Sequence, residues 1–543
     1  MRGSTWRILP ADPLQAATLA RRCGMDALIG QLLLNRGIRH AAEAQQFFAP
    51  RLASLNDPFQ LPHMNTAVWR IRCAVDRKEP IVVFGDSDVD GVTAAAIVAE
   101  VITALGGLVT ARLSDRLADG YGIPEHLIAR LMRDQVKLLV AVDCGTNQPG
   151  IIRQLSEAGI ETLILDHHVP ITQPAKPLAF VNPKFHNTSG QELCSAGLAF
   201  KLAQALSQDA PDRLRGVSDL AMLGTLADYA PLIGDNRVMI AAGLEQLLTG
   251  QRPGLKVLCE SVQLNTPTPE QILRRLIPRL NAPGRLGKAH LLWRALVAPS
   301  SVRAKRYAEL LGAAHAQTKT LHRQILLEAQ EQASRIHLKD HYVMVVGRNG
   351  WHPGVMGPIA AQLVDTYARP AIAIAFEDDT GIGSGRSIAA FDLFQALRAC
   401  EGVLMRYGGH PQACGLTLAR THLETFRDRI NQHAHGFLQR QELSRTLTID
   451  AEVEAGWLTQ RVAQTIQQFA PFGSGNSRPL FVLRNLLVQR QDAKTAWMTD
   501  GASRLRLRSR AMDIVPGERY DVVGGLELVG EEPAFSVSDA RLS

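Results

Sequence analysis

Between about residues 66 and 245, short apolar runs alternate with longer segments in which apolar residues recur at helical spacing. Short apolar runs bounded by turn signals are typical of strands that are buried on both faces of a sheet. Such strands, when they alternate with helices, form parallel, doubly wound α/β sheets. The expected strands are Ile81–Phe84, Leu138–Val142 and Thr162–Leu165, and the helices between them include Thr93–Leu105 and Glu125–Asp134.

The pattern changes along the rest of the chain and predicts further regions. Ala304–Ile336 has few helix-breaking residues, which predicts one long helix that links two lobes. Tyr342–Val346 and Ala371–Phe376 are expected strands of a second α/β lobe. The predicted regions are a helical lead-in that caps the next domain (1–65), the parallel-sheet domain (66–245), a helical connector (246–335), the second α/β domain (336–440) and a small β-barrel (447–543).

Acidic residues and histidines follow the apolar runs of the predicted sheet. Aspartate is common in turns, so each group alone is compatible with a solvated turn. The ends of parallel strands converge at one edge of a sheet, where open α/β folds bind their ligands. Carboxylates held that close repel one another unless a cation lies among them, which predicts a divalent metal site. The residues are Asp86, Asp88 and Asp90 after the first strand, Asp143 after the second, Asp166-His167-His168 after the third, and Asp228 after the apolar run 220–227.

Three further segments have a composition that suits an anion. Residues 279–287 are expected to form a loop with two arginines around a Pro-Gly turn, which is either a surface turn or a phosphate contact. Residues 381–387 are expected to form a Gly-rich loop, which is either a hairpin or a cradle of backbone N–H groups for an anion. In Gly408-Gly409-His410 the glycines allow close backbone approach beside an imidazole that is either structural or catalytic.

The C-terminal region contains the strictly alternating segment Arg504-Leu505-Arg506-Leu507-Arg508, which places three arginines on one face of a strand. This face is either solvated or part of an oligonucleotide-binding barrel. Soon after Arg510 the chain reaches a turn at Val515-Pro516-Gly517.

Composition limits the function classes. The chain has 543 residues, of which 46% are hydrophobic and 20% charged, which is ordinary for a globular protein of several domains. The net charge of +7 favours a polyanionic partner only weakly. Seven cysteines without a C-x-x-C pair indicate neither a disulfide scaffold nor a zinc site. No apolar stretch has the length of a signal peptide core or of a membrane span, so a cytoplasmic location and no membrane partner are expected.

The order of these motifs resembles the DHH phosphoesterase superfamily, which is named after the triplet that stands here as Asp166-His167-His168. Longer stretches resemble more specifically the RecJ family of bacterial single-strand exonucleases, from about residue 25 to the end of the chain. These stretches are Arg116–Gly122, Gly224–Leu232, Arg279–Gly287, Trp351–Gly357, Gly383–Ser387, Gly408–His410 and Pro471–Asn476.

The resemblance implies a metal-dependent exonuclease that removes mononucleotides from the 5′ end of single-stranded DNA in repair and recombination. It implies two divalent ions, Mn²⁺ or Mg²⁺, with Asp88, Asp90, Asp143, His167 and Asp228 as ligands and with Asp86 and Asp166 as ligands or supports. It implies that His168 and His410 contact the scissile phosphate. It assigns substrate binding to Arg116, Arg279, Asn281, Arg285, Ser384, Arg386, Gly408 and Gly409, with Arg285, Ser384 and Arg386 at the 5′-terminal phosphate. A single-strand-binding protein and a helicase are the protein partners it suggests, and a monomer is expected.

The chain departs from the family pattern at Ser87, at Pro283 and at Tyr229-Ala230, and none of these changes removes an expected ligand. The resemblance also implies about one more strand after Arg510, so a shortened barrel is expected, which would affect the binding of single-stranded DNA more than catalysis. Two other functions remain open. A DHH phosphodiesterase of short oligonucleotides or cyclic dinucleotides is disfavoured by the chain length, by segment 279–287 and by the extra C-terminal region. An inactive DHH scaffold for replication or repair is disfavoured because every expected acid and histidine is present.

Overall fold

A computed structural model describes residues 4–171, 176–186, 188, 192–250, 252–337, 341–438, 446–492, 495–508 and 514–543. The chain forms two compact units. The larger unit comprises residues 55–230 and 234–443, and the smaller unit comprises residues 1–54, 231–233 and 444–543.

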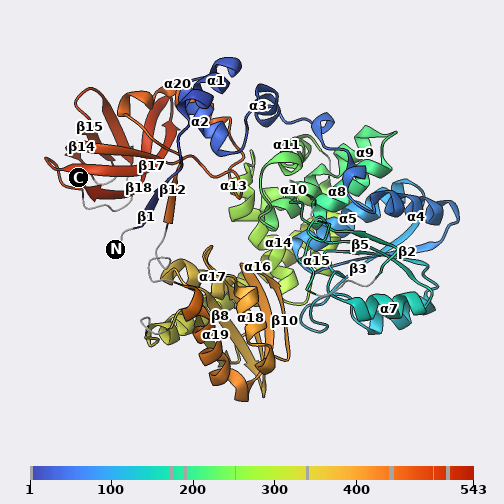
Figure 1. The fold of residues 1–543 in the computed structure, drawn as a ribbon. Helices are drawn as coiled ribbons and strands as arrows, with labels where there is room; N and C mark the ends of the chain where they lie inside the picture. The colour runs from blue at the N-terminus through green and yellow to red at the C-terminus, as the bar shows by residue number, and fades with distance from the viewer. Residues whose placement is uncertain are drawn as a thin grey trace. The chain divides into compact units, whose positions relative to one another are not determined.

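A five-stranded, fully parallel sheet forms the first part of the larger unit, as the sequence predicts. Its strands lie in the order β3-β2-β4-β5-β6. Figure 1 labels β2, β3 and β5 of this sheet among the helices of the same region. They are β2 (Pro80–Gly85), β3 (Leu108–Leu113), β4 (Leu138–Val142), β5 (Glu161–Leu165) and β6 (Ala179–Val181). The chain moves from β2 outward to β3 and then back past β2 to β4. The strand order therefore reverses between β2 and β4, which is where sheets of this topology bind ligands.

Helices cover both faces of this sheet. On one face, Val82 and Phe84 of β2 share a core with residues of α6 and α7. Ile81 and Val83 alternate with them and are buried on the opposite face. The helices of this region are α4 (Met64–Asp76), α5 (Val89–Ala104), α6 (His126–Arg133), α7 (Pro149–Glu157), α8 (Ser195–Leu206), α9 (Pro211–Gly216), α10 (Ser218–Ala227) and α11 (Gly234–Thr249).

The sequence pattern suggests that the apolar run before Asp228 is a further strand of the sheet, but the structure shows that it is not. It forms helix α10, and Asp228 is its C-cap residue. Every residue from Ser218 to Leu226 is buried, so the run has no polar face that would reveal helical periodicity. Asp228 therefore reaches the sheet edge from a helix end.

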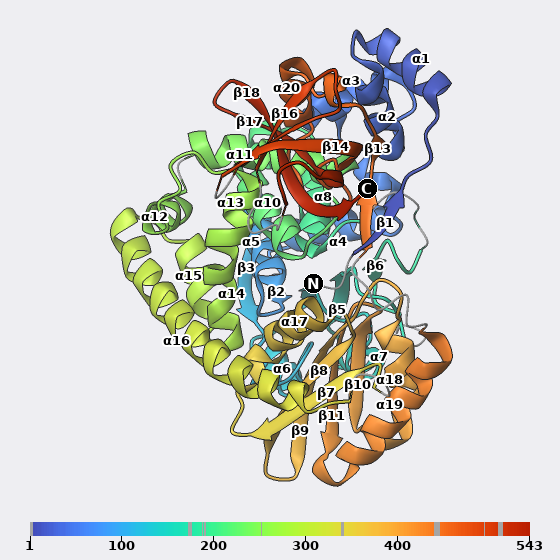
Figure 2. The same ribbon diagram turned by 90° about the vertical axis from the view of Figure 1, so that its left-hand side faces the viewer.

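A helical connector follows and contains the predicted long helix, α16 (Ser301–Ser334), which Figure 2 shows as one continuous element. Segment 279–287 is mostly helical rather than a loop, because α14 (Ile277–Arg285) continues through Pro283. Leu280, Ala282, Pro283 and Gly284 are all buried, so tertiary packing overrides the turn tendency of the Pro-Gly pair. The other connector helices are α12 (Pro253–Ser261), α13 (Pro269–Gln271), a π-helical turn (Ile272–Leu276) and α15 (His290–Leu296).

The second α/β lobe has a mixed sheet in the order β10-β11-β9-β8-β7, in which only β7 and β8 are parallel. Its strands are β7 (Met344–Asn349), β8 (Ala371–Glu377), β9 (Thr380–Arg386), β10 (Arg406–His410) and β11 (Ala413–Ala419). Its helices are α17 (Met356–Tyr367), α18 (Leu393–Ala399) and α19 (Leu423–Phe437).

The two Gly-rich segments of this lobe are strands, not the anion-cradling loops that the sequence suggested. Residues 381–386 lie in β9, and Gly408-Gly409-His410 ends β10. The alternate glycines of β9 face bulky neighbours: a Cβ on Gly383 would lie 3.1 Å from side-chain atoms of Ile374 and Leu416. The glycines therefore allow close packing inside a sheet, and they do not free backbone N–H groups.

The smaller unit contains a closed barrel of five strands in the order β14-β15-β16-β18-β17, with β17 pairing back to β14. The expectation of a shortened barrel is therefore wrong, because the long strands β17 and β18 close the ring of strands. Leu505 and Leu507 of β16 are buried, which confirms the predicted alternation with arginines. The strands are β14 (Phe481–Gln491), β15 (Thr495–Thr499), β16 (Arg504–Arg508), β17 (Arg519–Val529) and β18 (Glu532–Leu542).

Of the N-terminal region that the sequence predicts as a lead-in, the described residues up to Ser54 belong to this smaller unit, and residues from Leu55 onward belong to the larger unit. Strand β1 (Thr5–Ile8), which the sequence analysis did not predict, pairs in parallel with β12 (Thr446–Ile449). Leu32 and Leu33 share one core with Phe469 and Phe481. The remaining elements are α1 (Pro13–Cys23), α2 (Ala27–Asn35), α3 (Ala41–Phe48), β13 (Ala451–Glu452) and α20 (Gln460–Gln467).

Among the helices that the structure describes, none combines the length and apolar character that crossing a membrane requires.

Candidate metal centre and arginine cluster

The first group of acids is fixed where β2 turns into α5. Asp88 is the N-cap of α5, and its carboxylate accepts a hydrogen bond from the Gly91 N–H at 3.1 Å. Asp90 lies in the first turn of the helix. A Cβ on Gly91 would lie 2.6 Å from backbone atoms of Asp86, so only glycine lets the helix start this close to the strand. The spacing of the acids thus follows from a tight strand-to-helix turn.

The Asp86 carboxylate is held by hydrogen bonds from the segment that follows the neighbouring strand β3. Its two carboxylate oxygens accept hydrogen bonds from Ser114 Oγ at 2.6 Å and from Arg116 Nη2 at 2.7 Å. Both donors follow the neighbouring strand β3. One Asp86 oxygen nevertheless remains within 4.8 Å of ligand atoms of Asp88 and Asp143.

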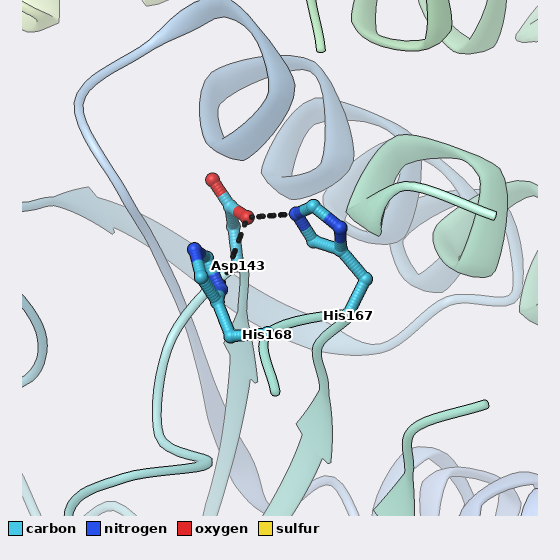
Figure 3. Close-up of side chains that lie close together, drawn as sticks. All are labelled: Asp143, His167 and His168. Atoms are coloured by element: carbon cyan, nitrogen blue, oxygen red, sulfur yellow. Dashed lines mark ion pairs between the residues drawn. The ribbon is translucent and has the colours of Figure 1, made fainter. Parts of the chain in front are cut away.

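Asp143 follows β4 with a backbone φ of 62°, in the left-handed region that residues other than glycine rarely adopt. Such strain is typical of functional positions. Figure 3 shows its carboxylate between two imidazoles, 3.4 Å from His167 Nε2 and 4.0 Å from His168 Nδ1. The residue with this unusual backbone conformation thus places its carboxylate at the centre of the cluster.

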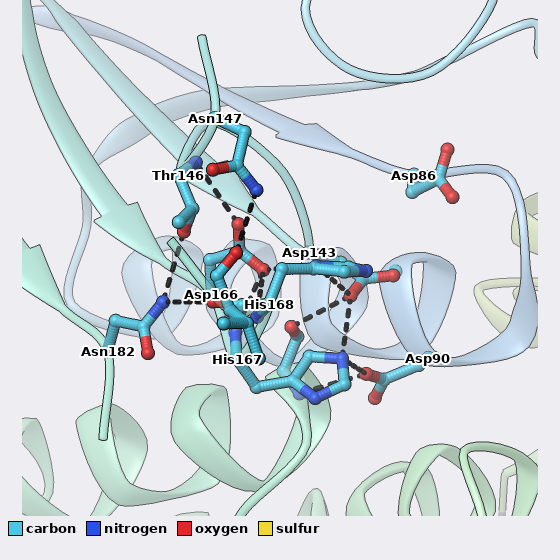
Figure 4. Close-up of polar contacts among 12 residues, drawn as sticks. Asp86, Asp90, Asp143, Thr146, Asn147, Asp166, His167, His168 and Asn182 are labelled. Carbon is cyan, nitrogen blue, oxygen red and sulfur yellow. Dashed lines mark hydrogen bonds and ion pairs between the residues drawn. The ribbon is translucent and has the colours of Figure 1, made fainter. Parts of the chain in front are cut away.

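His167 connects Asp143 with two further carboxylates. Its Nε2 lies 3.8 Å from Asp90 Oδ2, and its Nδ1 lies 3.7 Å from Asp228 Oδ2 (Figure 4 draws the first contact). A Cβ on Gly224 would lie 2.9 Å from Asp90 Oδ1, so this glycine lets α10 approach the centre and bring Asp228 with it.

The start of helix α8 holds two of the acids, and the sequence analysis missed it. The N–H groups of Ser195 and Ala196 each donate to one oxygen of Asp90 at 2.8 Å. Ser195 Oγ donates to Asp143 Oδ1 at 3.0 Å. Free N–H groups at a helix N-terminus favour a carboxylate. Small residues opening an apolar helix were the available signal, but nothing local tied them to acids about 50 and 100 residues earlier.

The crowding shifts the pKa values of these acids upward. Burial is the largest cause, and the neighbouring carboxylates add to it, so the pKa of Asp90 rises to about 6. The same two causes raise the pKa of Asp88, and raise those of Asp143 and Asp228 well above the ordinary value. Bound cations would reverse these shifts by compensating the carboxylate charge.

The donor atoms fit divalent cations. Ligand atoms within 4.8 Å of one another occur in three groups: Asp86, Asp88 and Asp143; Asp143, His167 and His168; and Asp90, Cys194 and Asp228. Two groups therefore share Asp143. Carboxylates with imidazole suit Mn²⁺ and related ions, and carboxylates alone suit Mg²⁺.

Asp166 has a different environment from the other acids. One of its oxygens accepts from the His167 N–H at 2.8 Å and lies 2.7 Å from His168 Nδ1, and the other accepts from the Thr146 N–H at 3.2 Å (Figure 4). Burial alone would raise the pKa of Asp166, but His168 and these hydrogen bonds hold it below its usual value. Asp166 thus acts as the partner that orients His168.

Two histidines stack beside the centre. The rings of His168 and His410 are 5.0 Å apart and nearly parallel. Burial opposes charge on His168, but Asp166 outweighs it and raises the pKa of His168. Burial and the charge on His168 lower the pKa of His410 to about 3, and its Nε2 has no hydrogen-bond partner among the described residues. Tyr121, another residue that the sequence analysis did not select, places its hydroxyl 3.0 Å from His168 Nδ1.

Two of the predicted arginines, Arg116 and Arg285, lie close enough to a third, Arg386, to affect its pKa. Burial lowers the pKa of Arg386, and Arg285 and Arg116 lower it further. Burial also lowers the pKa of Arg285, and Asp88 opposes this shift. Arg116 is paired with Asp86, whereas Arg285 and Arg386 form no ion pair with any described residue. We call Arg116, Arg285 and Arg386 the arginine cluster; its unpaired charges suit an anion.

Glycines make room for this cluster. A Cβ on Gly357 would lie 3.0 Å from Arg386 Nη2, and one on Gly354 would overlap the Arg285 carbonyl oxygen. Both glycines belong to the segment Trp351–Gly357. Ser384 alternates with Arg386 along β9, so both side chains lie on the face opposite the buried glycines.

The structure does not bring every predicted substrate-binding residue to this place. Arg279 Nη1 donates to the carbonyl and hydroxyl oxygens of Ser261 on α12. Asn281 accepts a hydrogen bond from the Val89 N–H at 3.1 Å, so it supports the turn that carries the acids. Gly408 and Gly409 lie in β10 just before His410, with Gly409 at a φ of 137°.

Comparison with known proteins gives the family. The DHH family N-terminal domain matches residues 80–225, the DHHA1 domain matches residues 340–436, and the RecJ OB domain matches residues 449–516. The single-stranded-DNA-specific exonuclease RecJ of Bacillus subtilis (strain 168) is 30% identical over 99% of this chain and 71% of its own length. The chain belongs to the RecJ family.

Solved structures of another RecJ agree with this assignment. The crystal structure of RecJ in complex with Mn²⁺ from Thermus thermophilus matches with a TM-score of 0.85 and 27% identity, covering 100% of this chain and 80% of that one. The same protein in complex with Mg²⁺ matches with a TM-score of 0.78 and 25% identity, covering 99% and 78%. The predicted RecJ resemblance and the predicted domain folds are thereby confirmed.

Proposed function

We propose that this chain is a metal-dependent exonuclease that hydrolyses single-stranded DNA from the 5′ end and releases mononucleotides. The observation that carries the proposal is the presence, in one unit, of a carboxylate and imidazole centre suited to divalent cations and of an arginine cluster suited to a phosphate. The named relatives, which are single-stranded-DNA-specific exonucleases, support the substrate class.

Two divalent ions, Mn²⁺ or Mg²⁺, would supply an activated water and stabilise charge on the attacking and leaving oxygens. Asp88, Asp90, Asp143, His167 and Asp228 would hold them. Asp86, whose oxygens already accept two hydrogen bonds, would contribute one oxygen or only shape the site. The N–H groups of Ser195 and Ala196 orient Asp90, and orientation of this kind supports metal affinity.

His168 would donate a hydrogen bond to the scissile phosphate. Asp166 raises the pKa of His168 against the effect of burial, which favours the protonated imidazole, and it also holds the orientation of the ring. His410 stays neutral because burial and His168 lower its pKa, so its unpartnered Nε2 would serve as a hydrogen-bonding contact rather than as a charge. The stacked rings would thus meet the same phosphate with different protonation states.

The arginine cluster would hold the terminal phosphate of the 5′ nucleotide. Guanidinium groups bind phosphate bidentately, and neither Arg285 nor Arg386 has a carboxylate to satisfy it among the described residues. Ser384, on the same face of β9 as Arg386, would add a hydroxyl. Holding one end of the strand beside the metal centre fixes which bond is cut, which gives both direction and single-nucleotide steps.

The barrel of the smaller unit would bind the strand by stacking and charge. Arg504 and Arg506 both lie over the ring of Trp497, with distances from guanidinium carbon to ring centroid of 4.9 Å and 6.0 Å. Aromatic rings flanked by arginines on strands of such barrels suit unpaired bases and phosphates.

The test is hydrolysis of a single-stranded oligonucleotide with a fluorescent label at either end, with and without a 5′ phosphate, in Mn²⁺. The expected result is immediate loss of the 5′ nucleotide with stepwise shortening, faster with the 5′ phosphate. Release from the 3′ end would contradict the direction. Turnover of dinucleotides alone would support the alternative phosphodiesterase, and DNA binding without turnover would support the alternative scaffold.

Roles in repair and recombination, a cytoplasmic location, a monomeric state, and a single-strand-binding protein and a helicase as partners remain our proposals from the family. The seven free cysteines are in keeping with a reducing compartment.

A further inference from the structure

Cys194 lies at the metal centre, and the proposed hydrolysis gives it no role. The residue is 1% exposed and immediately precedes helix α8. Its Sγ lies within 4.8 Å of one carboxylate oxygen of Asp90 and one of Asp228, which are themselves within that distance of each other. The thiol donates a weak hydrogen bond to Thr225 Oγ1, with a sulfur-to-oxygen distance of 3.8 Å. The sulfur is therefore part of the same cluster of donor atoms as the two carboxylates.

The neighbouring imidazole gives independent reason to expect a ligand here. His167 is only 7% exposed, and its ring makes no hydrogen bond with the residues that the structure describes. Its Nε2 lies 3.4 Å from Asp143 Oδ1 and 3.8 Å from Asp90 Oδ2, and its Nδ1 lies 3.7 Å from Asp228 Oδ2. A buried imidazole that faces three carboxylates without a well-aligned hydrogen bond to any of them is typical of a site that a cation completes.

We propose that Cys194 is a direct ligand of the cation held by Asp90 and Asp228, and that its sulfur makes this position prefer thiophilic divalent ions such as Zn²⁺ or Co²⁺ over Mg²⁺. Sulfur and imidazole ligands favour such ions, whereas carboxylates and water favour Mg²⁺ and Mn²⁺. On coordination, the cation takes the place of the thiol proton, which passes to solvent.

The two halves of the centre then differ in the ions they select. The group of Asp86, Asp88 and Asp143 offers oxygen atoms alone, whereas the group of Asp90, Cys194 and Asp228 offers oxygen and sulfur. The inference rests on the metal-binding part of the proposed function and not on the substrate or on the direction of hydrolysis.

The test is a titration of the metal-depleted full chain with Co²⁺, followed by sulfur-to-cobalt charge-transfer absorption in the near ultraviolet. The wild type is expected to show this band. Cys194→Ala is expected to lose the band and about 10- to 100-fold in Co²⁺ affinity, the range that follows loss of one metal-orienting group. Cys414→Ala, which removes another buried thiol, should keep both. A wild type that binds Co²⁺ without the band, or a band that persists in Cys194→Ala, would overturn the proposal.

X-ray absorption spectroscopy of the Zn²⁺-loaded wild type tests whether Cys194 is a ligand without the need for a variant. With zinc at both positions, about one sulfur for every two zinc ions is expected, and coordination by oxygen and nitrogen alone would contradict the role of Cys194. Neither readout depends on DNA. Absence of nuclease activity would therefore leave this result standing, and an active nuclease without the sulfur signal would refute only this inference.

Discussion

The metal centre and the arginine cluster lie in the same unit and carry opposite charges, and the Arg116–Asp86 ion pair joins the two places. In the centre, burial and mutual repulsion raise the pKa values of the carboxylates. In the cluster, burial lowers the pKa values of Arg285 and Arg386. Both shifts mean that the charged form is costly until a counter-ion arrives. This difference indicates that the metal centre binds cations and that the arginine cluster binds a phosphate.

The largest expected effect comes from removing the shared carboxylate of the metal centre. Asp143→Ala should lower the rate of single-strand hydrolysis by about 10⁴-fold, because residues that act as one catalytic unit fail together. Affinity for DNA should change little, since the arginine cluster remains. Single-turnover hydrolysis and fluorescence anisotropy measure the two quantities. The exposed Asp209→Ala is the control, and wild-type rates in Asp143→Ala would remove this residue from the centre.

The next effect separates the arginine cluster from an ordinary basic surface. Arg386→Ala should weaken the preference for a 5′-phosphorylated end by about 10- to 100-fold, the value of one charge-assisted hydrogen bond. Arg279→Ala is the matched control, because its guanidinium binds Ser261 instead. The measurement is KM for substrates with and without the phosphate. Equal losses in the two variants would show that the effect is general electrostatics.

A pH effect follows from the raised pKa values of the metal centre. Asp90, with a pKa of about 6, binds a proton below that pH and must release it to bind a cation. In the metal-free chain its folded pKa exceeds the unfolded value, so its contribution to stability falls as pH rises from about 4 to above 6. Mn²⁺ affinity should therefore rise about fourfold from pH 5.5 to pH 7.5, as the deprotonated fraction of Asp90 increases.

Thermal denaturation with and without Mn²⁺ measures this effect through the ligand-induced rise in Tm. The rise should be larger at pH 7.5 than at pH 5.5, and Asp90→Asn should show little rise at either. An equal Mn²⁺-induced rise at both pH values would contradict the assignment of the titrating carboxylate.

How well the sequence predicts the metal centre and the arginine cluster depends on which elements of the chain supply their residues. Asp86, Asp143 and Asp166 each follow a strand of one parallel sheet, so a local pattern predicts their convergence. Arg116, Arg285 and Arg386 come from the segment after β3, the end of α14 and the end of β9. No periodicity connects these three elements, and only the resemblance to the RecJ family connected two of the arginines with one phosphate.

The sequence misled where tertiary packing overrode local tendency. Pro283-Gly284 predicts a turn, but burial against the strand end keeps it helical: a Cβ on Gly284 would overlap the Ser87 carbonyl. The glycines of β9 predict a loop, but they pack against side chains of neighbouring strands. No local signal tied Cys194 and Ser195 to the acids, because their contacts with Asp90, Asp143 and Asp228 join residues far apart in the chain.

The smallest expected effect concerns the barrel. Trp497→Ala should weaken binding of long single strands by about fivefold, the lower range for loss of one base-stacking ring. Hydrolysis of short oligonucleotides should stay unchanged, because the metal centre and the arginine cluster belong to the larger unit. An equal loss of affinity for short and long substrates would show that Trp497 does not contribute to binding of the long strand.

The most direct test of the central claim is a crystal structure of the Asp143→Asn variant with Mn²⁺ and a 5′-phosphorylated oligothymidylate, with manganese located by anomalous scattering. We expect manganese among Asp88, Asp90, His167 and Asp228, and the terminal phosphate within hydrogen-bond distance of Arg285 and Arg386. Manganese bound elsewhere, or a 5′ phosphate away from both arginines, would contradict the account.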